Sequence, residues 1–265
     1  EKDVRELSAL VRSNLGNADG KLPDLVTVCD ALDVLIVEHH FASADVDAVA
    51  VTERGPGNGA ALVVAQGSHA WRSLLRRRVL LAHELCHVLA DPLGEDADAT
   101  IDFASDSSED QDAEPNRLRY LPQRVSQERR ARAFAAEFLM PSAGLHRLLG
   151  PPRHAHDYGA AQRMVDQVRE HFETPLEIAL NQLWNRGYLA PIPNLRTEDP
   201  RADLLAYLRS SRARQGLSVE PVAPLHSSLA RRVQQAWESD LCSDAEARRW
   251  LDLSPFDPLP WSRAE

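Results

Sequence analysis

Residues 80–92 read "LLAHELCHVLADP" and place two histidines four positions apart, with a glutamate directly after the first. In a helix, His83 and His87 are rotated by about 40° and displaced by about 6 Å along the axis, so both rings can reach one point. Glu84 is turned about 100° from His83 and lies beside that point. The pattern is surrounded by apolar residues, which predict a heavily buried helix: Leu80, Leu81, Leu85, Val88 and Leu89.

This H-E-x-x-H spacing predicts a catalytic metal site. Two imidazoles that reach one point suit two of the four ligand positions of tetrahedral zinc. Zinc lowers the pKa of a bound water to about 7, and Glu84 is placed to take its proton as general base and to pass it to a leaving amine. The alternative is a pair of core histidines, but burying them without partners would be costly.

A catalytic zinc needs a third protein ligand. The sequence offers several candidates, namely Asp91, the acidic stretch 93–117, Glu128, Glu137, His154, His156 and His171. In the predicted helix 126–141, Glu128 shares a face with Ala131 and Ala135, where a second helix could approach closely, whereas Glu137 faces the opposite side. Since an acid in the first turn also complements the helix dipole, spacing alone leaves the role of Glu128 open.

The pattern of apolar residues predicts an α+β fold. β-branched runs predict three short strands of a small sheet, at residues 34–41, 46–53 and 60–67. Helical periodicity predicts helices at residues 3–16, 23–33, 71–90, 126–141, 160–172, 175–187, 201–214, 227–240 and 243–252. The polar, acidic residues 93–117 are predicted to form a loop. Three prolines between residues 190 and 200 predict a boundary between a domain at 1–190 and an all-helical C-terminal region at 191–265.

Composition limits the setting of the protein. The chain of 265 residues has a formal net charge of −10, which argues against a nucleic-acid-binding surface over the whole molecule, although a local basic patch is compatible with it. The basic run at residues 76–78 is interpreted as a solvated face, with contact to the acidic stretch or to nucleic acid as the alternatives. No apolar run is long enough to cross a membrane.

The N-terminus and the cysteines indicate the cellular compartment. The chain begins without a signal-peptide core and without an initiator Met, so we expect it to be trimmed or to continue a longer protein. The three cysteines, Cys29, Cys86 and Cys242, are few and far apart, which predicts a reducing, cytoplasmic location.

Two segments carry a resemblance to a known family. "RRRVLLAHELCHVLADP" (76–92) and "ERRARAFAAEFLMP" (128–141) resemble the paired helices of the ImmA/IrrE family of zinc metallopeptidases, and the resemblance extends over about residues 5–190. It implies a zincin-like fold in which Zn²⁺ is held by His83, His87 and Glu128, with Glu84 as catalytic base. Cys86 stands where the family usually has Gly, and Arg132 stands where it usually has Asn.

The resemblance also implies a function. The protein is expected to be a zinc-dependent endopeptidase of the cytoplasm that cleaves a protein regulator, typically a helix-turn-helix repressor, in a stress or mobile-element response. One alternative is a non-proteolytic regulator whose zinc domain senses or binds a partner, but such a protein has no need of Glu84. A second alternative is a zinc hydrolase of a small molecule. A free strand edge beside the site would favour a peptide substrate instead.

The C-terminal helices contain apolar positions whose role the sequence leaves open. They are Leu205, Leu208, Leu229, Val233 and Trp237. The first interpretation is that these side chains pack against the zinc domain. The second is that part of this surface docks a folded protein substrate.

Overall fold

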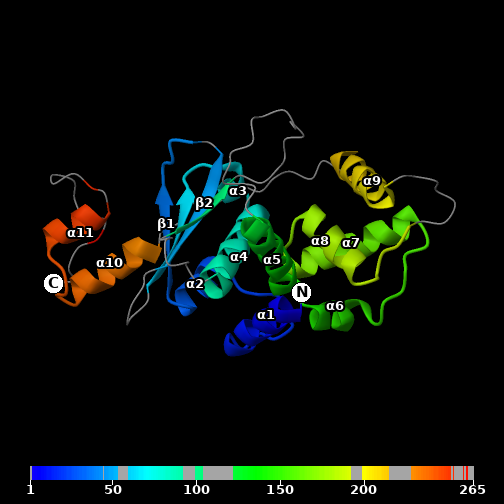
Figure 1. Ribbon diagram of the computed structural model, residues 1–265, viewed down its shortest axis with the longest axis horizontal. Coiled ribbons are helices and arrows are strands. Elements are labelled where there is room, and N and C mark those ends of the chain that lie inside the picture. Colours follow the sequence, from blue (N-terminus) through cyan, green and yellow to red (C-terminus); the bar gives the residue numbers. More distant parts are fainter. Residues whose placement is uncertain are drawn as a thin grey trace.

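The computed structural model describes most of the chain: residues 2–43, 45–52, 59–91, 99–103, 122–191, 199–214 and 228–251, and residues 253, 259 and 261. Within these residues the protein is an α+β fold, in which helices pack around one small mixed sheet (Figure 1). None of the described helices combines the length and apolar character that a membrane-spanning helix needs.

The sheet has four described strands in the order β1-β3-β2-β4. These strands are β1 (Val34–His39), β2 (Val46–Thr52), β3 (Ala60–Ala65) and β4 (Ala99–Phe103). β1 pairs with β3 in parallel, while β2 is antiparallel to both β3 and β4. The first three strands lie within the three β-branched runs, as predicted.

The fourth strand corrects the prediction that residues 93–117 form a loop. β4 pairs with β2, with Ile101 opposite Val49 and Thr100 opposite Ala50. The free edge of β2 offers unpaired backbone N–H and C=O groups, and pairing with them stabilises a strand that the acidic composition of the segment does not predict. Residues 92–98 and 104–121 lie outside the described residues.

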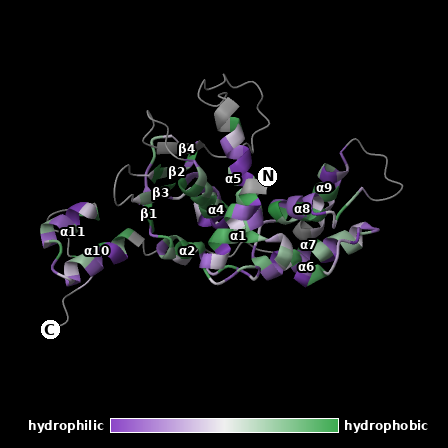
Figure 2. Ribbon diagram, turned by 60° about the horizontal axis from the view of Figure 1, so that its bottom comes forward, coloured by the Kyte–Doolittle hydropathy of each residue, from purple (hydrophilic) through white to green (hydrophobic). Residues whose placement is uncertain are grey.

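One face of the sheet is covered by helices. Alternate strand residues point into the main core, among them Ile36, Ala48 and Leu62, and Figure 2 shows hydrophobic residues along the strands and along α4 (Leu74–Ala90). α4 contacts β2 and β3, α2 (Leu25–Ala31) contacts β1 and α4, α5 (Pro122–Leu139) packs on α4, and α1 (Lys2–Asn14) packs on α5.

The helix predicted at 71–90 is divided near its start. The short helix α3 (His69–Arg72) ends at Ser73, and the Ser73 side chain caps α4 by accepting a hydrogen bond from the backbone N–H of Arg76 at 3.4 Å. The H-E-x-x-H residues therefore lie in the middle and last turns of a capped helix that packs directly on the sheet.

A second core joins the helices that follow α5. These are α6 (Ser142–Leu149), α7 (Tyr158–Phe172), α8 (Leu176–Asn185) and α9 (Pro200–Arg214). Leu204 and Leu208 of α9 are buried in this core together with residues of α6, α7 and α8, and Leu205 packs against it. The division at residue 190 stays a prediction.

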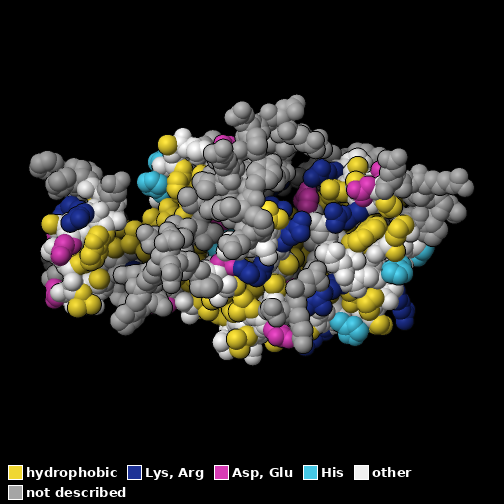
Figure 3. Space-filling model, in the orientation of Figure 1, with side chains coloured by type: hydrophobic (Ala, Val, Ile, Leu, Met, Phe, Trp, Pro, Cys, Tyr) yellow, Lys and Arg dark blue, Asp and Glu magenta, His cyan; other side chains and the backbone are white. Residues whose placement is uncertain are grey.

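The last two helices, α10 (Ser228–Glu238) and α11 (Asp244–Trp250), form a small core of their own. Val233 and Trp237 are buried in it, and Leu229 packs against it. Leu208, Val233 and Trp237 are buried, so these three side chains stabilise the C-terminal helices. Docking of a protein substrate on the remaining surface of these helices stays a prediction. The large apolar side chains exposed on this unit are instead Leu241 and Trp250, and hydrophobic side chains are visible on its surface in Figure 3.

Only part of the arginine run at residues 76–78 is the solvated face that the sequence predicts: Arg76 is exposed, whereas Arg77 and Arg78 are buried. The guanidinium of Arg77 lies over the ring of Trp71, 5.3 Å from its centroid. Arg78 donates hydrogen bonds to the carbonyls of Pro23 and Leu22 at 2.9 and 3.2 Å. Both arginines are buried, and Arg78 holds the segment between α1 and α2 against α4.

Arg12, at the end of α1, is fully buried. Like Arg78, it holds the segment between α1 and α2 in place. It donates hydrogen bonds to the carbonyls of Ala18, at 3.0 Å, of Gly20, and of Phe138 near the end of α5. Burial lowers the pKa of Arg12 to about 10, partly offset by the charges of Asp19 and Glu137, so the side chain remains a cation at neutral pH. It therefore fastens α1 to α5, the helix that packs on α4.

Replacing Arg12 with Met is expected to destabilise the fold strongly. The substitution leaves the buried carbonyl of Phe138 and the partly buried carbonyls of Ala18 and Gly20 without their donor, which predicts a loss of about 2–4 kcal/mol in the free energy of unfolding. Denaturant unfolding measures this loss, with Arg5→Met, at an exposed position of the same helix, as the control. An unchanged unfolding midpoint in Arg12→Met would show that these hydrogen bonds contribute nothing net.

Candidate metal centre

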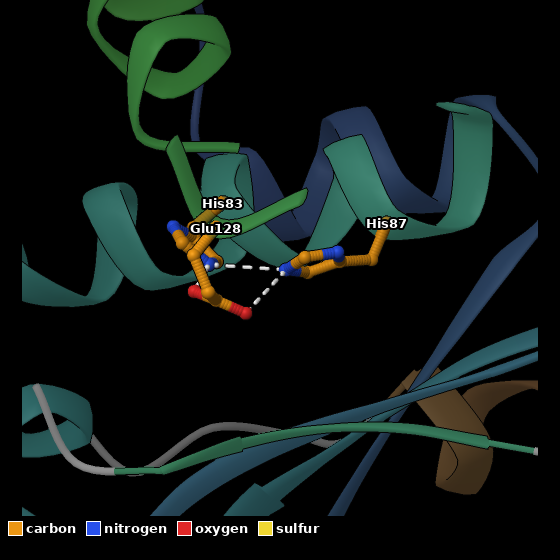
Figure 4. A group of neighbouring side chains, drawn as sticks. All are labelled: His83, His87 and Glu128. Atoms are coloured by element: carbon orange, nitrogen blue, oxygen red, sulfur yellow. Dashed lines mark hydrogen bonds and ion pairs between the residues drawn. The ribbon is translucent and has the colours of Figure 1, made fainter. Parts of the chain in front are cut away.

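Three side chains from two helices converge on one point beside the sheet. His83 and His87 come from α4 and Glu128 comes from the first half of α5, and Figure 4 shows the two rings and the carboxylate turned toward one another. The Nε2 atoms of the histidines are 3.1 Å apart. The Glu128 carboxylate lies 3.1 Å from His83 Nε2 and 3.6 Å from His87 Nε2. The structure thus brings together the two histidines of the motif and one of the candidate third ligands.

These separations fit a divalent cation of the size and preference of zinc. Bonds of about 2.0–2.1 Å to a tetrahedral zinc place two ligand atoms about 3.3 Å apart. The observed 3.1, 3.1 and 3.6 Å lie on either side of that value. Two imidazoles and one carboxylate form the donor set of many catalytic zinc sites. His83, His87 and Glu128 are therefore the residues that would hold the metal.

Asp91 lies beside this group and has a different role from that of a ligand. Its Oδ2 is 2.7 Å from Nδ1 of His87, and its side chain is almost completely buried. Since a carboxylate only accepts hydrogen bonds, the contact assigns the imidazole hydrogen of His87 to Nδ1. Nε2 is left with its lone pair toward the candidate site, as in the carboxylate–histidine–metal arrangements of many proteins. The His87–Asp91 spacing of four in a helix is the sequence signal for this contact.

Glu128 reaches the histidines because α5 packs closely on α4. Ala131 and Ala135, which share its helix face, are buried and small enough for the close approach that the sequence predicts. Burial raises the pKa of Glu128, but the hydrogen bond and charge of His83, with the charges of His87 and Arg132, outweigh it and hold the pKa below its ordinary value. The carboxylate is therefore ionised at neutral pH. Arg132, which departs from the usual family residue, is exposed.

Two further residues of the motif are buried in α4. Glu84 is fully buried next to His83 in the chain, so it lies at the same turn as the candidate ligands. Cys86 is also fully buried, and burial raises the pKa of its thiol to about 12, although the charge and hydrogen bond of Arg130 act in the opposite direction. Cys86 is therefore a thiol and not a thiolate at neutral pH, which argues against its acting as a reactive or metal-binding group.

The other third-ligand candidates lie elsewhere or are engaged differently. The Glu137 carboxylate accepts hydrogen bonds from the Ser142 backbone at 2.9 Å and from Gln182 at 2.9 Å, and it pairs with Arg186. It joins the end of α5 to α6 and α8. Three histidines are exposed and outside the group of converging ligand atoms: His154, His156 and His171. Among the acidic residues of 93–117, those at 93–98 and 104–117 lie outside the described residues.

Comparison with known proteins agrees with this geometry. Residues 29–183 match the sequence pattern of peptidase family M78, described as the IrrE N-terminal-like domain. The matched residues run from α2 to α8 and include α4, α5 and all three converging side chains. No curated protein matches the chain. Because the match covers more than half of the chain, the protein belongs to the M78 family of metallopeptidases, with an IrrE N-terminal-like domain.

Proposed function

We propose that the protein is a zinc-dependent endopeptidase of the cytoplasm that cleaves a specific protein regulator, typically a helix-turn-helix repressor, in a stress or mobile-element response. The observation that carries the proposal is the convergence of His83, His87 and Glu128 in a chain of a metallopeptidase family, with Glu84 in the same turn of α4. The free thiols of Cys29, Cys86 and Cys242 are in keeping with a reducing compartment.

The chemistry divides between the metal and the residues of the chain. Bound zinc would supply a Lewis acid and a water whose pKa is lowered to about 7. His83, His87 and Glu128 would hold it. Glu84 would serve as general base, accepting a proton from the attacking water and returning it to the leaving amine. Asp91 keeps the Nδ1 hydrogen of His87 in place while this happens.

A strand edge favours a peptide over a small molecule as the substrate. In the described sheet, β4 is the outermost strand next to β2. Its outer edge can add an extended peptide by backbone hydrogen bonding, which selects for an unfolded or loop segment of a protein. A small molecule cannot form the series of backbone hydrogen bonds that such an edge offers to a peptide.

The proposal is tested by asking what the zinc-loaded protein cuts. The purified protein is incubated with helix-turn-helix repressors encoded near its gene and, separately, with casein, and the products are mapped by mass spectrometry. Cleavage of one repressor at one or a few sites, with little casein digestion, is the expected result. The Glu84→Gln protein, prepared in the same way, controls for contaminating proteases.

Other outcomes distinguish the alternatives. Broad digestion of casein without preference for any repressor would reject dedicated regulatory cleavage but keep peptidase chemistry. Tight binding of a repressor without any cleavage by the zinc-loaded protein would instead support the non-proteolytic regulator.

A further inference from the structure

A buried ion pair links the two helices that carry the candidate metal ligands. Asp91 follows the last residue of α4 and pairs through Oδ1 with the guanidinium of Arg130 on α5. Its other oxygen, Oδ2, contacts Nδ1 of His87 at 2.7 Å. The same carboxylate therefore touches a candidate ligand with one oxygen and an arginine of the neighbouring helix with the other.

The carboxylate of Asp91 needs a cationic partner. Its side chain is 1% exposed, whereas that of Arg130 is 34% exposed, so the guanidinium extends from the interior toward solvent. Transferring an isolated carboxylate to the interior is unfavourable, and an ion pair with additional hydrogen bonds offsets that cost. Arg130 thus gives the buried carboxylate a second partner besides the imidazole of His87, and the two contacts together fix its position.

The placement of Arg130 follows from the same helix contact that places Glu128. On α5, Glu128 and Arg130 lie on either side of Ala131, at about 60° and about 100° around the helix axis. Ala131 is fully buried, so this line of the helix faces α4. One packing arrangement thus carries Glu128 to the two histidines and Arg130 to Asp91.

We propose that Arg130 is a positioning residue of the metal centre: it fixes Asp91, and Asp91 in turn fixes the ring orientation and tautomer of His87. This inference rests on the proposed function, since it requires that His87 binds a metal. A pair that merely joined α4 to α5 would affect the stability of the metal-free protein and leave the properties of the loaded centre unchanged. A positioning pair affects the affinity for zinc and the orientation of the ligand at the loaded centre.

The experiment measures the affinity for zinc by competition with a chelator. Arg130→Met, which keeps an unbranched apolar stem and removes the charge, is expected to weaken zinc binding by about 10–100-fold. Arg130→Lys restores the charge and is expected to recover part of this loss. Arg129→Met, at an exposed position of α5, is the matched control and should bind zinc as the original protein does.

Two further measurements separate positioning from simple stabilisation. The visible spectrum of the cobalt-substituted protein should change in Arg130→Met and not in Arg129→Met, because the spectrum reports ligand orientation. Thermal unfolding of the metal-free proteins gives the structural contribution alone. If Arg130→Met does not fold, Asp91→Asn, which preserves shape, is expected to show the same loss of affinity.

The outcomes keep the two proposals apart. If the original protein binds no zinc, the proposed function fails. If it binds one zinc and both Arg130→Met and Asp91→Asn bind it equally well with an unchanged cobalt spectrum, the metal centre stands and the positioning role of Arg130 is wrong.

Discussion

The Glu84→Gln protein is expected to contain about one zinc per chain and to have lost hydrolysis by at least the 10²–10⁴-fold that general acid–base catalysis typically contributes. Glutamine has nearly the same shape as glutamate, so the fully buried position of Glu84 in α4 can accommodate it. It cannot accept the proton of the attacking water. The ligands His83, His87 and Glu128 are unaltered, so the metal should stay.

Two measurements on the same preparation test this expectation. Zinc content is measured after dialysis, and cleavage is measured on the repressor that the original protein cuts. Full activity in Glu84→Gln would remove Glu84 from the mechanism and with it the peptidase chemistry proposed here. Loss of both zinc and activity would show that Glu84 also supports the metal centre.

Removing any one of the three converging side chains should have the largest effect on metal binding. His83→Ala, His87→Ala and Glu128→Ala are each expected to weaken zinc binding by more than about 100-fold. Loss of a residue that only hydrogen-bonds a ligand has a smaller effect, up to roughly 100-fold. In each case a tetrahedral site would lose one of its protein donors. Metal analysis after dialysis against a weak chelator measures the loss.

Glu137→Ala is the matched control on the same helix, and its effect should be of a different kind. Glu137 is buried and holds Ser142, Gln182 and Arg186, so its removal leaves the buried Gln182 and the half-buried Arg186 without their partner. The expected cost is about 3–5 kcal/mol in the free energy of unfolding, with zinc binding retained in the folded protein. If Glu137→Ala loses the metal and Glu128→Ala keeps it, the assignment of the third ligand is wrong.

Much of the centre follows from local spacing in the sequence. A separation of four residues sets the angle between His83 and His87 in any helix, so their convergence could be predicted without the fold. The same periodicity placed Glu128 on the small-residue face of its helix and Glu137 on the other, and the structure brings Glu128 and not Glu137 to the histidines. The three β-branched runs likewise predicted three strands, because side-chain alternation is a local property.

Other features were not predicted from the sequence. Asp91 was one of several candidate ligands, although its spacing of four from His87 is the signal for the contact with Nδ1 that the structure shows. Arg130 carries no local signal at all, since its role depends on how closely α5 approaches α4. Strand β4 forms because the edge of β2 is open to it.

The buried arginines and the apolar residues of the C-terminal helices show the same limit. Arg77 and Arg78 look solvent-exposed in a basic run, yet the nearby ring of Trp71 covers Arg77 and two carbonyls far away in the chain hold Arg78 inside. Val233 and Trp237 look available to a partner, yet they fill the small core of α10 and α11. Periodicity along the chain determined which faces of the helices are apolar and where the metal-binding side chains point. Only the tertiary structure decided what covers those faces and which charges support the site, because both depend on contacts between residues that are far apart in the sequence.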